Sequence, residues 1–165
     1  MGVAFNAEEI YRIGVEIEKN GKAFYAAAAK RAAEPAVRKL FEDLSRWEDQ
    51  HVATFESLRA EFDKPGSAEV IADVNDEVLG YLKAAADSHV FGRGHDAAKL
   101  AAACKTPVDA LRKALEFEKD SIVVYASMRL LVPEHMGRAR VEALADEELK
   151  HVVLLQKLIA EHSKA

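Results

Sequence analysis

Two pairs of residues in this chain combine a carboxylate with an imidazole at the same short spacing. Glu48 is followed three residues later by His51, and Glu148 is followed at the same spacing by His151. On an α-helix this spacing puts both side chains on one face, one turn apart, so that both can reach a single ion. Chance predicts about 0.65 such pairs for a chain of this composition, so one pair alone would be weak evidence. Two pairs indicate metal-binding chemistry.

The two pairs belong to an internal repeat with an offset of 100 residues (148 − 48 and 151 − 51). Residues 16–25 resemble residues 116–125, and residues 42–61 resemble residues 142–161. In each half, a further glutamate lies 30 residues before the Glu-x-x-His pair (48 − 18 and 148 − 118). A duplicated helical hairpin explains this constant offset economically. Coincidence between two hairpins rich in Ala, Leu and Glu is the alternative, and it explains the matching histidines and tyrosines poorly.

The repeat supplies four carboxylates and two imidazoles that could share a site. All four glutamates have mainly apolar neighbours at helical spacing, and an unpaired carboxylate in such a stripe costs several kcal/mol. Bound cations would compensate that cost, whereas a buried Glu–His hydrogen-bond network without metal is the alternative. Glu16 and Glu116 have charged neighbours instead and are predicted to be solvated. The predicted metal ligands are Glu18, Glu48, His51, Glu118, Glu148 and His151.

Aromatic residues around these ligands are expected to have mainly structural roles. Tyr25 and Tyr125 lie one helix face along from Glu18 and Glu118, so they are expected either to hydrogen-bond a ligand, to shuttle electrons or simply to pack. The other large rings of the first half are expected to belong to the core, namely Phe41, Trp47, Phe55 and Phe62.

Long helices must position these residues, and the composition favours them. Only eight Gly and four Pro interrupt a chain rich in Ala, Leu, Glu and Lys, which are helix formers. Helical hairpins are predicted over about residues 7–63 and 107–163, with a connector over residues 64–106 that contains a short helix at about 75–87. We therefore expect one all-α domain, a four-helix bundle with one long crossover connection.

Local signals mark where the helices begin. Asn6 and Glu9 have the spacing of a capping box that opens the first helix. Pro35 suits the first turn of the second helix. Thr106 followed by Pro107 predicts a capped start for the third helix.

Composition excludes several classes of function. A net charge of −5 argues against a nucleic-acid or anionic-membrane surface. The chain has no apolar run of about 18 residues that could span a membrane. Its first residues lack the pattern of a signal peptide, so we expect a cytoplasmic location. Cys104 is the only cysteine, which excludes a disulfide, a thiolate zinc site and an iron–sulfur cluster within one chain.

Over nearly its whole length the sequence resembles the rubrerythrin branch of the ferritin-like superfamily, most clearly at residues 16–25 and 116–125. The resemblance implies a ferritin-like bundle with two iron ions that reduces hydrogen peroxide or oxygen. Rubrerythrins proper carry a four-cysteine rubredoxin domain, so this chain would need a separate electron-donor protein such as a rubredoxin. Bacterioferritins bind haem through a methionine beside the second-helix Glu. Asp49 occupies that place here, so no haem is expected.

The metal and the function class leave alternatives. Four carboxylates with only two imidazoles favour iron or manganese, with zinc as a further alternative. Besides the redox enzyme, the pattern fits a ferroxidase or iron-storage subunit. It also fits a non-catalytic helical bundle that binds a partner and holds a vestigial or non-iron site. Because long bundles often bury a side face, we expect a homo-oligomer, with a dimer favoured.

Overall fold

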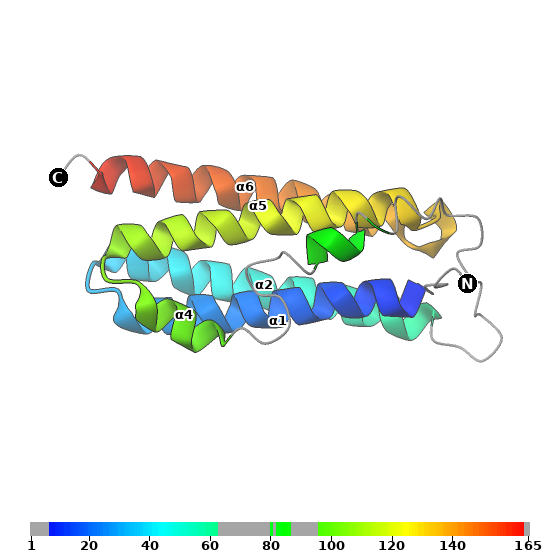
Figure 1. Ribbon diagram of the computed structural model, residues 1–165, viewed down its shortest axis with the longest axis horizontal. Helices are drawn as coiled ribbons and strands as arrows, with labels where there is room; N and C mark the ends of the chain where they lie inside the picture. The colour runs from blue at the N-terminus through cyan, green and yellow to red at the C-terminus, as the bar shows by residue number, and fades with distance from the viewer. Residues whose placement is uncertain (1–6, 63–79, 81, 87–95, 164–165) are drawn as a thin grey trace.

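The computed structural model of the chain describes residues 7–62, 80, 82–86 and 96–163. Within these ranges the regular structure is helical and contains no strand, which confirms the all-α prediction. The four long helices lie side by side as a bundle (Figure 1). They are α1 (Ala7–Arg31), α2 (Pro35–Phe62), α5 (Pro107–Leu131) and α6 (Arg138–His162), accompanied by the shorter α4 (Ala97–Ala103) and the 3₁₀ turn η1 (Glu134–Met136).

The helices form two antiparallel hairpins joined across the length of the bundle. Figure 1 shows that α1 and α2 run in opposite senses, as do α5 and α6, while α2 and α5 run in the same sense. The chain must therefore return from the end of α2 to the opposite end of the bundle before α5 begins. Helices that follow one another in the chain and run in the same sense need a long connection between them.

Side-chain capping and proline explain two of the helix starts. Thr106 accepts a hydrogen bond from the backbone N–H of Asp109, and the Asp109 carboxylate accepts one from the backbone N–H of Thr106. This reciprocal pair confirms the predicted start of α5. α2 begins at Pro35, also as predicted. The capping residue expected at Asn6 lies outside the described residues.

The connector contains a helix that was not predicted. Asp96 accepts hydrogen bonds from the backbone N–H groups of Ala98 and Lys99, and these bonds cap the start of α4. α4 packs against α1 through its small buried residues. The helix predicted at about 75–87 lies mostly outside the described residues, but residues 80 and 82–86 within it are helical.

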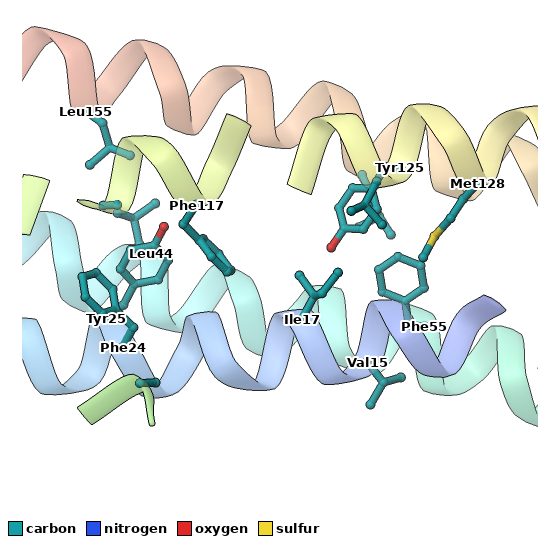
Figure 2. Close-up of a cluster of buried hydrophobic side chains, with 14 of the residues drawn as sticks. Val15, Ile17, Phe24, Tyr25, Leu44, Phe55, Phe117, Tyr125, Met128 and Leu155 are labelled. Carbon is teal, nitrogen blue, oxygen red and sulfur yellow. The ribbon is translucent and has the colours of Figure 1, made fainter. Parts of the chain in front are cut away.

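Buried aromatic rings fill the bundle on both sides of its centre. Along α1, Tyr11 lies seven residues before Glu18 and Tyr25 lies seven residues after it. The ring of Tyr25 meets that of Phe117 edge-on, with centroids 5.8 Å apart, and Phe55 packs against Tyr125 at 5.3 Å. Figure 2 shows these rings entering the interior from both hairpins. Along α1, Glu18 therefore lies about 10 Å from the aromatic layer that contains Tyr11 and about 10 Å from the layer that contains Tyr25.

None of the described helices has both the length and the apolarity to cross a lipid bilayer.

Candidate metal centre

The six predicted ligands meet in the interior of the bundle. Each is no more than 5 % exposed, although all six are polar or ionisable. All four long helices contribute: α1 carries Glu18, α2 carries Glu48 and His51, α5 carries Glu118, and α6 carries Glu148 and His151. Glu16 and Glu116 are exposed, as predicted from their charged neighbours.

The ligand atoms form two overlapping groups, and the atoms of each group lie within 4.8 Å of one another. Both groups contain Glu48 and Glu148. The first group adds Glu18 and His51, and the second adds Glu118 and His151. Two neighbouring cation positions with two shared carboxylates fit this pattern, and each position would have one further carboxylate and one imidazole.

Both histidines direct Nδ1 into the carboxylate cluster. In the first group, Nδ1 of His51 lies 3.0 Å from Glu148 Oε1 and 3.4 Å from Glu18 Oε2. In the second group, Nδ1 of His151 lies 2.8 Å from Glu148 Oε2 and 3.5 Å from Glu118 Oε2. Donor atoms bound to one ion at about 2.1 Å are typically about 3 Å apart, so these separations suit ligands of a shared cation.

Several carboxylate oxygens in the cluster are buried without a hydrogen-bond partner. Both oxygens of Glu18, both oxygens of Glu48, Oε2 of Glu118 and Oε1 of Glu148 have no partner among the described residues. Buried polar groups in folded proteins are nearly always hydrogen-bonded, and a buried carboxylate without a partner is costly. Cations would satisfy these oxygens directly, so the donor set fits a metal centre.

Burial and crowding raise the pKa of three of the four glutamates. Burial raises the pKa of Glu18 to about 7. Burial and the charge of Glu148 raise the pKa of Glu118 to about 8. Burial and the charge of Glu18 raise the pKa of Glu48 well above its usual range. A bound dication would favour the ionised carboxylates and displace these protons.

The pKa values of the other cluster members depend on burial and on the close approach of oppositely charged or polar neighbours. Burial alone would lower the pKa of His151, but the nearby carboxylates of Glu118 and Glu148 outweigh it and raise that pKa to about 10. The pKa of His51 is raised for the same reason. Burial would raise the pKa of Glu148, but the polar groups of Glu118 and of both histidines close to its carboxylate outweigh burial and lower that pKa. The pKa values of the cluster members are therefore shifted in different directions.

Three residues outside the ligand set hold it in place. Tyr25 donates a hydrogen bond to Oε1 of Glu118, one of the roles expected for this residue. Oε2 of Glu147 lies 2.9 Å from Nε2 of His51, a contact that was not predicted. Trp47 was expected in the core, but it is only partly buried and stacks on the ring of His151.

Comparison of the chain with protein-family models, with curated proteins and with solved structures finds no significant match. The functional argument therefore depends on the chemistry of the site.

Proposed function

We propose that this chain is a ferritin-like, rubrerythrin-related di-iron protein that reduces hydrogen peroxide or oxygen with electrons from a separate donor protein. The observation that carries the proposal is the pair of overlapping ligand groups that share Glu48 and Glu148. The common direction of α2 and α5 agrees with a bundle of the ferritin-like type. Iron is proposed over zinc because oxygen ligands outnumber the two nitrogen ligands.

Each half of the site would contribute distinct ligands to the chemistry. Glu18 with His51, and Glu118 with His151, would hold one cation each, and the shared glutamates would lie between the two cations. When bound, two ferrous ions would supply the two electrons that, with two protons, convert one molecule of hydrogen peroxide into two molecules of water. The separate donor would then return two electrons.

The protein around the ligands would fix their geometry and exclude water. Tyr25 holds Glu118 through its hydroxyl, so that this carboxylate is oriented before a cation arrives. The aromatic layers on either side of Glu18 limit the entry of water, which strengthens electrostatic interactions inside the site. The ligands come from four rigid helices, so little reorganisation is needed on binding.

Iron stoichiometry tests the proposal. The full chain is loaded with Fe(II) under anaerobic conditions, desalted and analysed for metal, with about two irons per chain expected. Hydrogen peroxide should then oxidise the bound iron at one peroxide per two irons. Glu148→Ala and His51→Ala should lose two-iron binding, whereas the exposed Glu16→Gln should retain it. Retention of two irons by both ligand variants would refute this site, and tight binding near zero would refute the di-iron assignment.

We also propose that the chain forms a homodimer. Large apolar side chains are exposed on the outer surfaces of α5 and α6, which favours their burial against a second copy. These side chains are Val123, Leu130, Leu149 and Val153. Solution mass measurement tests this proposal: twice the chain mass is expected. A large assembly with many irons per chain would instead point to iron storage.

A further inference from the structure

Among the repeat-related positions at which the two halves differ, one pair contacts the histidine ligands. Residues 47 and 147 are separated by the repeat offset of 100 (147 − 47), and each directly precedes a shared glutamate. Position 47 is a tryptophan and position 147 is a glutamate. The ligands themselves are identical in the two halves, so the difference lies in what supports each imidazole.

The imidazole of His51 has a carboxylate behind it. Its Nδ1 faces the ligand cluster, and its Nε2 lies 2.9 Å from Oε2 of Glu147. A proton on Nε2, donated to this carboxylate, leaves the lone pair of Nδ1 free to bind a cation. The negative charge of Glu147 also makes Nδ1 a stronger electron donor. Glu147 thus fixes both the orientation of the ring and its tautomer.

The imidazole of His151 is supported by a different kind of contact. The indole of Trp47 stacks on it, with ring centroids 5.1 Å apart and planes 10° from parallel. In the described part of the chain, the contact between His151 and each of its three carboxylate partners involves Nδ1, as does its hydrogen bond with Glu148. The stacking restrains the ring, but it adds no negative charge and accepts no proton.

We propose that Glu147 is a positioning residue that makes the His51 half of the centre bind its metal ion more tightly than the His151 half, so that the two ions load in order. This inference rests on the proposed two-metal function and adds that the two halves of the site bind metal with unequal affinity. Partners behind a ligating histidine typically change metal affinity by about 10- to 100-fold, so the two binding steps should differ by at least about 10-fold.

Cobalt titration of the apoprotein tests the order of loading without measuring activity. The absorption of bound Co(II) counts the ions, and calorimetry separates the two steps. Trp47 is the only tryptophan, so its fluorescence reports on the half whose histidine it touches. We expect two resolved steps, with the larger share of the quenching in the second step. Two steps of equal affinity, or quenching confined to the first step, would overturn the inference.

Variants at the two repeat-related positions separate a positioning role from a merely structural one. Glu147→Gln keeps an acceptor near His51 but removes the charge, so the first step should weaken by about 10-fold while the second stays unchanged. Trp47→Glu supplies the carboxylate that the other half already has, and it should strengthen the second step. The exposed Glu116→Gln changes the charge equally without touching either histidine, and both steps should match the wild type.

The outcomes distinguish this inference from the proposed function. A chain that binds no cobalt refutes the metal centre and the inference together. Two bound ions with an unchanged first step in Glu147→Gln refute the inference alone and leave the two-metal site in place. Loss of both steps in Glu147→Gln, with the helical circular dichroism retained, would also overturn it, since Glu147 would then support the whole centre.

Discussion

Tyr25 on α1 donates a hydrogen bond to Glu118 on α5, so the first helical hairpin holds a ligand of the second. The repeat-related Tyr125 does not reproduce this contact, because its buried hydroxyl has no partner among the described residues. Figure 2 shows the two rings entering the interior from opposite hairpins. The duplicated sequence has therefore produced two similar tyrosines with different roles.

Tyr25→Phe should weaken both the apoprotein and its metal binding. Because the raised pKa of Glu118 keeps this group neutral in the apoprotein at pH 7, loss of the hydrogen bond costs about 0.5–1.5 kcal/mol of unfolding free energy, or roughly 1–6 °C in melting temperature for a chain of this size. Metal affinity should fall by about 10-fold because Glu118 is no longer oriented. Thermal unfolding of the apoprotein and Co(II) titration measure the two effects.

Tyr125→Phe is the matched control for that substitution. It removes a buried hydroxyl that has no hydrogen bond to lose, so the unfolding free energy should stay unchanged or rise by about 1 kcal/mol. Equal destabilisation by the two phenylalanine variants would show that the bond from Tyr25 to Glu118 contributes nothing specific.

Glu48→Gln should stabilise the apoprotein while impairing metal binding. Glu48 is fully buried among other carboxylates, and its raised pKa reflects the cost of ionising it there. A neutral amide removes that cost, so the unfolding free energy of the apoprotein should rise by about 1–2 kcal/mol. Binding of both ions should weaken because both ligand groups contain Glu48.

Glu18→Gln provides the comparison, since Glu18 belongs to only one of the two groups. Its apoprotein should also be stabilised, but one ion should still bind with nearly unchanged affinity. Calorimetric unfolding and metal analysis measure both quantities. If Glu48→Gln retained one tight ion while Glu18→Gln lost both, the assignment of the shared ligand would be wrong.

The apoprotein should lose stability as the pH rises from about 4.5 to 10. The pKa of Glu18 rises on folding from 4.5 to about 7, and that of Glu118 rises from 4.5 to about 8, both mainly through burial. The pKa of His151 rises from 6.5 to about 10 because hydrogen bonds to carboxylates outweigh burial. In this window the folded state holds more protons than the unfolded state, so stability falls with increasing pH.

Bound metal should reverse that trend. Cations take the place of the protons on the ligand atoms, and at higher pH fewer protons compete with the cations for those atoms. Thermal unfolding at pH 5, 7 and 9, with and without Co(II), measures the difference. The pKa of Glu148 is lowered from its ordinary value of 4.5, so this group changes the stability only below pH 4.5, outside this window. Apoprotein stability that increased steadily across the window would contradict the proton-holding cluster.

Gly21→Ala should destabilise the bundle at the aromatic layer beside the site. A Cβ at this position would lie 2.4 Å from Cζ of Phe117, whose ring meets Tyr25 edge-on. Such overpacking costs about 1–3 kcal/mol, which outweighs the gain of up to about 1 kcal/mol in helix propensity. Denaturant unfolding should give a loss of about 1–2 kcal/mol.

The helical Gly80 offers a control, since a Cβ there meets no heavy atom within 4 Å. Gly80→Ala should raise the unfolding free energy by about 0.5–1 kcal/mol. If both alanine substitutions stabilised the protein, the close approach of α1 to Phe117 would not affect the unfolding free energy.

The long helices and the six candidate ligands could be predicted from the sequence alone. Helix boundaries depend on local chemistry, so Pro35 and the capping pair of Thr106 and Asp109 could be identified from neighbouring residues alone. The Glu-x-x-His pairs are also local, because one helical turn brings their side chains together. The repeat then connected each pair with a glutamate on another helix.

The way in which those residues meet depends on the packing of the helices in three dimensions. How closely the ligands of the two halves approach one another depends on how four helices pack, and helix spacing on one chain segment does not specify it. Two contacts join α2 to α6. His51 meets Glu147, which lies 96 positions away in the sequence (147 − 51), and His151 meets Trp47, which lies 104 positions away (151 − 47). Both contacts arise at the packed interface between helices, where a sequence with a partial repeat places unlike side chains behind like ligands.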